Sequence, residues 1–336
     1  MIPRSPSRLE SESWQRELAG GISDPLELLR ELNLSADQLP ALATAKGAFP
    51  LRVPRYFVGL MRRGDPKDPL LAQVLPLAAE QLAAEGYVSD PVGDMAASQD
   101  HGILKKYRGR ALMVTTGACA VHCRYCFRRH FPYAEHTLLR HWEDALAALA
   151  ELPDCHELIF SGGDPLSLSD RRLEQLVHAA DAVPQLQRLR VHTRLPVVLP
   201  QRVTARLVES FRNSRLQTLI VIHANHPNEI TNELRAALNK LTTEGIPILN
   251  QSVLLRSVND RADILTALSE ALFSIGVMPY YLHLLDPVAG AAHFDVPLAQ
   301  ARVLQAEMRE RLPGYLVPRV VKEIPGADSK TAIADL

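Results

Sequence analysis

The feature that most limits the fold of this chain begins at Ala111, where short β-rich runs start to alternate with amphipathic helical patterns. Repeated βα units predict a parallel sheet with right-handed crossovers, which either closes as a barrel or stays open as a doubly wound sheet. In both folds, ligands bind at the C-terminal ends of the strands. The six predicted strands are Ala111–Thr116, Glu157–Ser161, Arg188–Thr193, Gln217–His223, Ile248–Leu254 and Met278–Leu285.

Residues 1–105 have a different pattern, with amphipathic stretches around Trp14–Leu34 and Leu70–Glu85 separated by proline-rich turns. This region is predicted to be a helical N-terminal extension of one large catalytic domain. Lysine and arginine (37) nearly balance aspartate and glutamate (38), so no global positive field would attract nucleic acid or an anionic membrane. Small molecules are therefore the expected ligands.

Neither a signal peptide nor a stretch of some 18 apolar residues is found, so we expect a cytoplasmic protein. Three of the four cysteines, Cys119, Cys123 and Cys126, lie within eight positions. Such an unpaired set suits a metal in a reducing compartment better than disulfide bonds. Cys155 stands apart and is predicted to be a small buried hydrophobic residue.

The segment Cys119-Ala-Val-His-Cys123-Arg-Tyr-Cys126 follows the first predicted strand. Three thiolates at this spacing can hold three corners of an iron-sulfur cube and leave the fourth iron open to a further ligand. A structural zinc site completed by His122, His130 or Cys155 is the alternative, although the paired ligand spacing usual in zinc sites is missing.

This CxxxCxxC segment after a first strand resembles the signature of the radical S-adenosylmethionine (SAM) superfamily. The resemblance covers roughly residues 110–315 and implies a partial (βα)6 barrel, with residues 1–105 as the helical region, 106–315 as the barrel and 316–336 as a C-terminal segment. It also implies a 4Fe-4S cluster whose open iron binds SAM, and an external electron donor. Cleavage of SAM would then give a radical able to abstract an unactivated hydrogen.

Further candidates for the SAM site lie at the ends of later strands. Ser161-Gly162-Gly163-Asp164-Pro165 ends the second strand, where glycines permit close approach of the backbone to a ligand and an exposed carboxylate can accept from an ammonium group. A glycine turn with an aspartate cap is the alternative. By resemblance, Gly163 and Asp164 match the motif that holds the SAM amino group, and His223 and Gln251 match positions near SAM.

Lys330 lies after a Pro-Gly turn, where a desolvated amine can form a Schiff base with an aldehyde cofactor. A lone lysine near a C-terminus is ordinarily a solvated charge. This segment, however, resembles the turn that carries the pyridoxal phosphate (PLP) lysine in PLP-dependent radical SAM aminomutases, although their turn is richer in glycine. Lys106, Tyr107 and Arg110 match that family's cradle for the PLP phosphate, and cations with a phenol suit a phosphate dianion.

The same resemblance, to lysine 2,3-aminomutases, implies the substrate contacts. Arg128 matches the arginine that binds the substrate carboxylate, and its planar guanidinium suits that task. Asp286 and Glu323 match two carboxylates that hold the side-chain ammonium of L-lysine, although Glu323 replaces an aspartate. Taken alone, both acidic residues would more often lie at the surface or cap a helix.

The implied reaction moves the α-amino group of L-lysine to its β-carbon. The ends of the chain resemble the short bacterial form, whose (R)-β-lysine goes to a ligase that modifies elongation factor P, and a zinc-binding C-terminal extension is not expected. Two alternatives stay open at this point. One is a radical SAM enzyme that lacks PLP or acts on another amino acid, and the other is a non-catalytic iron-sulfur electron carrier.

Overall fold

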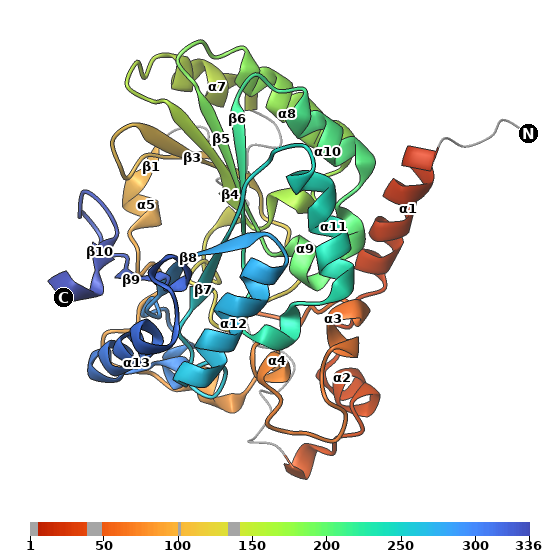
Figure 1. The fold of residues 1–336 in the computed structure, drawn as a ribbon, viewed down its shortest axis with the longest axis vertical. Helices are drawn as coiled ribbons and strands as arrows, with labels where there is room; N and C mark the ends of the chain where they lie inside the picture. Colours follow the sequence, from red (N-terminus) through yellow and green to blue (C-terminus); the bar gives the residue numbers. More distant parts are fainter. Residues whose placement is uncertain (1–5, 39–48, 100–101, 134–141) are drawn as a thin grey trace, which may run out of the picture.

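The computed structural model describes residues 6–38, 49–99, 102–133 and 142–336, and it contains a ten-stranded sheet in which the strands lie in their sequence order (Figure 1). Seven neighbouring strands, β3 to β9, are parallel. Sequential order without a reversal is the topology of a curved barrel sheet, so the structure excludes the doubly wound alternative. The parallel strands are β3 (Arg110–Thr116), β4 (Glu157–Gly162), β5 (Arg188–Thr193), β6 (Gln217–Ile222), β7 (Ile248–Val253), β8 (Val277–His283) and β9 (Arg319–Lys322).

Short strands extend the sheet at both edges. β1 (Ser98–Gln99) and β2 (Ile103–Leu104) add antiparallel to β3, and β10 (Thr331–Ala332) adds antiparallel to β9. Within the described residues β1 does not pair with β10, so the barrel is open. The six predicted strands are confirmed, whereas β1, β2, β9 and β10 were missed because runs of two to four residues carry little periodic signal. The predicted domain boundaries stay a prediction.

Helices cover the outer face of the sheet (Figure 1). Serine or threonine side chains cap three of them, because the hydroxyls of Ser169, Thr204 and Thr231 accept from the otherwise unpaired backbone N–H three residues later. These outer helices are α7 (Trp142–Ala150), α8 (Asp170–Asp181), α9 (Leu195–Val198), α10 (Ala205–Arg212), α11 (Asn232–Thr242), α12 (Ala262–Ser274) and α13 (Leu298–Arg311). Short 3-10 turns lie at Ala36–Gln38, Ala78–Gln81, Pro165–Ser167, Pro200–Arg202, Pro227–Glu229, Ala292–Phe294, Gly314–Leu316 and Ile333–Asp335.

The N-terminal region is helical but more broken than its pattern predicts. The amphipathic stretch Leu70–Glu85 is not one helix, because α4 ends at Ala72 and Pro76 precedes a separate 3-10 turn. Buried Trp14 anchors α1 against the barrel, where the Arg202 guanidinium lies 4.5 Å from its ring. The helices of this region are α1 (Pro6–Ala19), α2 (Pro25–Glu31), α3 (Arg55–Gly59), α4 (Pro69–Ala72) and α5 (Asp94–Ala97).

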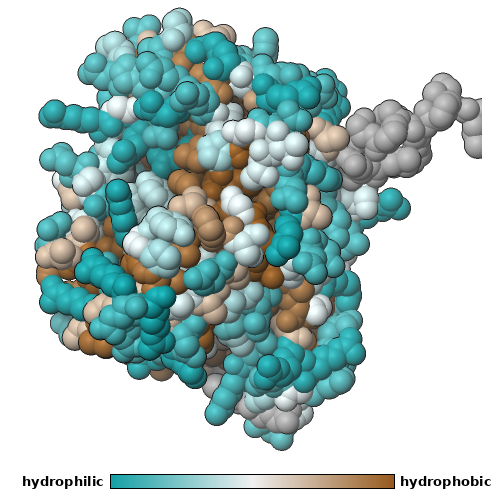
Figure 2. Space-filling model, viewed as in Figure 1, coloured by the Kyte–Doolittle hydropathy of each residue, from teal (hydrophilic) through white to brown (hydrophobic). Residues whose placement is uncertain are grey.

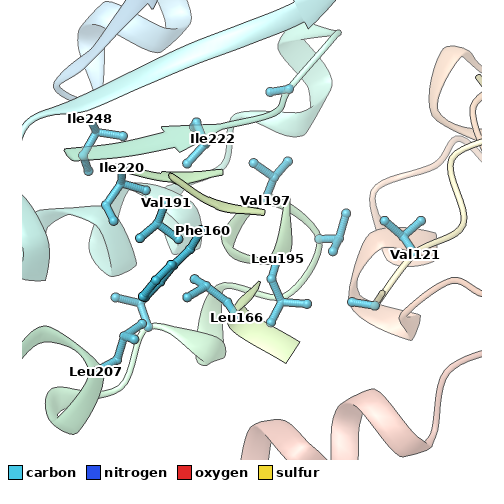
Figure 3. Packing of buried hydrophobic residues seen from close by; sticks show 14 of the residues in the cluster. Val121, Phe160, Leu166, Val191, Leu195, Val197, Leu207, Ile220, Ile222 and Ile248 are labelled. Carbon is cyan, nitrogen blue, oxygen red and sulfur yellow. The ribbon is translucent and has the colours of Figure 1, made fainter. Parts of the chain in front are cut away.

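The main core lies between the outer face of the sheet and the helices. Phe160, Val191 and Ile220, from three adjacent strands, pack near Leu207 of α10, and all four are almost fully buried (Figure 3). Because side chains alternate along a strand, the neighbouring positions face the inside of the barrel. Polar residues gather there, namely Glu157, Ser161, Arg190, His192 and Gln251.

The surface view shows apolar residues near the middle of one face with hydrophilic residues around them (Figure 2). In the described part of the chain, no helix combines the length and the hydropathy needed to cross a bilayer.

Candidate active site

A cavity of about 800 Å³ lies inside the curved sheet, and its lining extends from the first residues of β3, β4 and β9 to the loops that follow the C-terminal ends of the strands. Every residue assigned to the cluster, SAM, PLP or substrate in the sequence analysis lines this one cavity, although the residues come from widely separated segments. They are Cys119, Cys123, Cys126, Gly163, Asp164, His223, Gln251, Lys106, Tyr107, Arg110, Lys330, Arg128, Asp286 and Glu323.

The cysteine loop follows β3 and is held by backbone hydrogen bonds to the N-terminal region. The His122 N–H donates to the Arg52 carbonyl at 2.9 Å, and the Arg124 N–H donates to the Gln73 carbonyl at 2.9 Å. Burial and the neighbouring thiols raise the pKa of Cys126 to about 11 and raise that of Cys119 as well. Three crowded, half-buried thiols suit a bound metal group that would stabilise their thiolate forms. The donor set therefore fits an iron-sulfur cluster.

The geometry gives no support to a mononuclear zinc site. Zinc requires its ligand atoms within about 2.0–2.3 Å of one ion. Among the described residues, no three histidine, cysteine or acidic side chains are arranged to hold a single metal ion, the cysteine triad included. Cys155 is buried against the core and is absent from the cavity lining, as expected for a small hydrophobic residue.

The Gly162–Asp164 loop at the end of β4 packs directly on the cysteine loop. The Gly163 N–H donates to the Thr116 carbonyl at 2.7 Å, and the Asp164 N–H donates to the Ala118 carbonyl at 2.8 Å. A Cβ atom at Gly163 would lie 2.4 Å from the Ala118 oxygen, so only glycine fits there.

The expectation of an exposed Asp164 carboxylate is wrong. The side chain is buried, and its two oxygens accept hydrogen bonds from the Thr193 hydroxyl and from the backbone N–H groups of Leu166, Arg194 and Leu195. Asp164 therefore joins the end of β4 to the end of β5. Its carboxylate organises the loop, whereas any contact to an ammonium group must come from other atoms of the motif.

His223 and Gln251 lie together at the ends of β6 and β7. The Gln251 amide nitrogen lies 3.2 Å from the His223 ring nitrogen Nε2 and 3.4 Å from the His192 nitrogen Nδ1. Burial lowers the pKa of His223 to about 3 and lowers that of His192 well below its usual value. Both rings are consequently neutral near pH 7, and they can accept or donate one hydrogen bond without adding charge.

Charged side chains of alternating sign line the other part of the cavity. The Lys330 ammonium contacts Glu323 at 2.5 Å, and Lys106 lies 3.2 Å from the same carboxylate. Lys106 also contacts Asp94 at 2.5 Å. Burial opposes ionisation of Glu323, but the two ammonium groups outweigh it and lower its pKa to about 2. Lys330 is therefore partly buried beside an anion, within a cavity that holds the other candidate PLP contacts.

Arg128 is the next charged residue in this series, since it contacts Asp94. Its Nε donates to Asp94 at 2.6 Å, and a terminal nitrogen donates to the Ser161 hydroxyl at 2.9 Å. Nearby, the Arg110 guanidinium lies 4.5 Å from the centre of the Tyr107 ring. These cations and the phenol line the same cavity as Lys330, so the residues fit a phosphate-bearing cofactor held by the Lys330 amine.

Asp286 follows β8 and presents a buried, unsatisfied oxygen. Its Oδ1 atom has no hydrogen-bond partner in the described part of the chain. Burial raises the pKa of Asp286 to about 7, even though the Lys330 charge acts in the opposite direction. A carboxylate in this state favours the approach of a further cation, which would restore its ionised form.

Three residues of the site were not predicted from the sequence. Asp94 bridges Lys106 and Arg128, and His192 and His283 each bury an unsatisfied Nε2 atom. Strand alternation could have identified the two histidines, because each lies near the C-terminal end of a predicted strand. Asp94 lies in the N-terminal region and carries no comparable signal.

Comparisons with known proteins agree with this geometry. Residues 113–268 match the family "Radical SAM superfamily". The chain is 50% identical to the L-lysine 2,3-aminomutase of Escherichia coli K12, covering 98% of this chain and 96% of that protein. It is 45% identical to the L-lysine 2,3-aminomutase of Haemophilus influenzae, covering 100% and 99%.

A more distant relative is the L-lysine 2,3-aminomutase of Clostridium subterminale, which is 31% identical over 95% of this chain and 77% of that protein. High identity over nearly the whole length of several such proteins is consistent with the single cavity that unites the cysteine triad, the glycine loop and Lys330. The chain belongs to the L-lysine 2,3-aminomutase family of the radical SAM superfamily.

Proposed function

We propose that this protein is an L-lysine 2,3-aminomutase, which moves the α-amino group of L-lysine to the β-carbon and yields β-lysine. Family membership supports the reaction, and one observation carries its assignment to these residues. The cysteine triad, the Gly162–Asp164 loop, Lys330 and two carboxylates line the same cavity. An iron-sulfur electron carrier would need neither Lys330 nor the carboxylates, so the family and the cavity together disfavour that alternative.

Two sets of residues in the chain would bind the cofactors, one set for the cluster and SAM and the other for PLP. In the proposal, Cys119, Cys123 and Cys126 hold a 4Fe-4S cluster, and the Gly163 backbone, His223 and Gln251 bind SAM. Lys330 holds PLP by its amine, with Lys106, Tyr107 and Arg110 around the phosphate. The cluster and SAM supply one-electron chemistry that generates a carbon radical, and PLP supplies a π system across which the amino nitrogen can migrate.

Lysine carries one carboxylate and a distant ammonium group, and the cavity offers a partner for each. Arg128 would bind the carboxylate, with its guanidinium oriented by Asp94 and Ser161. Asp286 and Glu323 would bind the side-chain ammonium. Support for this assignment comes from Lys330, itself a lysine ammonium, which lies against Glu323 at 2.5 Å. A neutral or acidic amino acid would leave Asp286 without an ionic partner, so this carboxylate favours lysine over other substrates.

We also propose a cellular role on the basis of the resemblance to the short bacterial aminomutases. The product would be (R)-β-lysine, passed to a ligase that acts on elongation factor P, and an external protein would donate the electron. The cytoplasm is the proposed location, since the described cysteines are free and disulfide bonds are rare there.

Anaerobic reconstitution of the protein with iron, sulfide, PLP and a reductant tests the reaction directly. With SAM and L-lysine, the wild type should produce β-lysine, detected by mass spectrometry. Cys123→Ala should lose iron, sulfide and product, because only two of the three thiolates remain. Cys155→Ala is the matched control and should retain iron, sulfide and product formation. Formation of 5′-deoxyadenosine without β-lysine would refute the substrate assignment.

Lys330→Ala tests the PLP site. Reduction of the loaded wild type with borohydride should fix PLP to the peptide that contains Lys330, as peptide mass mapping would reveal. The variant should lose this adduct and at least about 100-fold in activity, because no amine replaces it. Lys322→Ala, a nearby lysine outside the cavity lining, should behave as the wild type. An unchanged adduct on another lysine in Lys330→Ala would contradict the assignment.

Asp286 should make lysine binding depend on pH. Its pKa is raised to about 7, so the carboxylate becomes protonated as pH falls below that value and can no longer pair with an ammonium group. The KM for lysine should therefore rise as pH decreases. Asp286→Asn should lower kcat/KM by a factor that corresponds to about 2 kcal/mol or more of lost binding free energy. It should also abolish this pH dependence. Asp328→Asn, on the exposed turn, should keep it, and a pH-dependent KM in Asp286→Asn would disprove the role.

The cellular role predicts a mass change in elongation factor P. Deletion of the gene from its host should remove the β-lysyl group, and the intact gene should restore it whereas Cys123→Ala should not. Mass spectrometry of the purified factor measures the outcome. A fully modified factor in the deletion strain grown without β-lysine would disprove this role without affecting the enzymatic assignment.

A further inference from the structure

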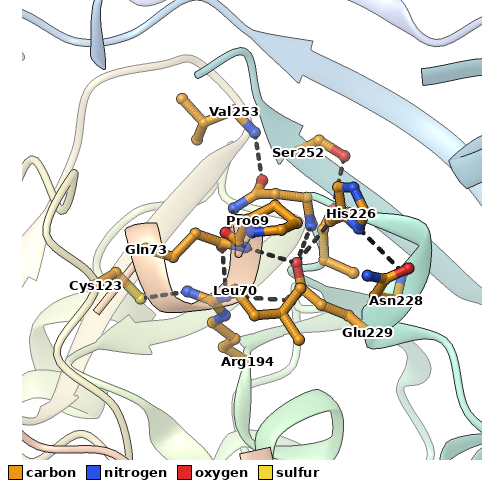
Figure 4. Close-up of polar contacts among 12 residues, drawn as sticks. Pro69, Leu70, Gln73, Cys123, Arg194, His226, Asn228, Glu229, Ser252 and Val253 are labelled. Carbon is orange, nitrogen blue, oxygen red and sulfur yellow. Dashed lines mark hydrogen bonds and ion pairs between the residues drawn. The ribbon is translucent and has the colours of Figure 1, made fainter. Parts of the chain in front are cut away.

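Arg194 is a buried arginine whose guanidinium is directed at a cluster cysteine. It directly follows β5 and precedes α9, and it is only 6% exposed. One terminal nitrogen, Nη1, donates to the Cys123 sulfur at 2.7 Å (Figure 4). The same nitrogen lies 2.6 Å from the Tyr125 hydroxyl. None of the roles proposed above uses this arginine.

A set of buried side chains holds the guanidinium in place. The second terminal nitrogen, Nη2, donates to the Gln73 side chain at 2.7 Å and to the Glu229 carboxylate at 3.1 Å (Figure 4). Gln73 and Glu229 are both fully buried. Glu229 is itself fixed, because its other oxygen accepts from the backbone N–H groups of Asn225 and His226. The arginine backbone is anchored too, since its N–H donates to Asp164 at 2.7 Å.

A purely structural ion pair does not explain this arrangement. Pairing with Glu229 and Gln73 accounts for the position of Nη2. The Tyr125 hydroxyl also contacts Nη1, but none of these contacts requires Nη1 to donate to a thiol as well. Burial of a guanidinium is costly, and residues from four separate segments combine to keep this one beside Cys123. The fixed positive charge and the hydrogen bond therefore act on whatever the sulfur binds.

We propose that Arg194 sets the reduction potential of the iron-sulfur cluster through its hydrogen bond and charge at the Cys123 sulfur. The inference rests on the proposed function, because it requires the cysteine triad to carry a cluster. On reduction, the cluster accepts one electron from the external donor, and no bond forms or breaks. The reduced cluster is more negative by one charge, so a nearby donor and cation stabilise it relative to the oxidised form. Hydrogen bonds to the sulfurs and local charge are established determinants of such potentials.

Two substitutions at this position separate charge from geometry. Arg194→Gln removes the cation and should disfavour electron uptake by about tenfold, a shift of about 59 mV toward lower potential for a one-electron couple. Arg194→Lys keeps the charge but loses the planar donor set, so its potential should lie between those of the wild type and Arg194→Gln. The matched control is Arg190→Gln, another cavity arginine on β5, which pairs with Glu157 at 3.1 Å and should leave the potential unchanged.

The measurement is a redox titration of the anaerobically reconstituted protein without SAM, followed by electron paramagnetic resonance of the reduced cluster. Equal midpoint potentials in the wild type and in Arg194→Gln, at equal iron content, would overturn the inference. Glu229→Gln decides the matter if Arg194→Gln does not fold, because it removes the countercharge of Arg194 and should raise the potential. An unchanged potential there would also overturn it. A wild type that takes up no iron and sulfide would instead refute the proposed function.

Discussion

Two backbone hydrogen bonds between neighbouring loops support the rest of the site. They join the Gly163 N–H to the Thr116 carbonyl at the end of β3, at 2.7 Å, and the Asp164 N–H to the Ala118 carbonyl of the cysteine loop, at 2.8 Å. The contact requires glycine, since a Cβ atom at position 163 would overlap the Ala118 oxygen. Through its side chain, Asp164 extends the connection to the end of β5. The cysteines, the glycine loop and Arg194 are thus held as one unit, and a loss of this close approach would displace them together.

The second part of the cavity depends on charge balance. Lys330, Glu323, Lys106, Asp94 and Arg128 alternate in sign and contact one another in that order. Alternation lets several charges be buried together, because each finds an opposite partner that offsets its loss of hydration. Asp286 stands at the edge of this chain with an unsatisfied oxygen and a raised pKa. The five alternating residues pair with one another, whereas Asp286 can still pair with one further cation. This agrees with a dibasic amino acid as substrate.

The N-terminal region is part of the active site and not only an appendage to the barrel. Asp94 comes from this region and contacts both Lys106 and Arg128. Gln73 holds Arg194 by its side chain and the cysteine loop by its backbone carbonyl. The cysteine triad and the charged side chains thus line one cavity to which the N-terminal region contributes Asp94.

The sequence by itself determined the six central strands, the cysteine triad and the glycine loop, because strand alternation and short motifs are local patterns. The family resemblance added Lys330, Arg128, Asp286 and Glu323, which the structure places in the same cavity. Only the tertiary structure decided that the sheet is an open barrel, that β9 and β10 extend it, and that the Asp164 carboxylate is buried. It alone joined Asp94 to Arg128 and Arg194 to Cys123. These contacts span 34 and 71 positions of the chain, and no local pattern encodes which distant partner will satisfy a buried charge.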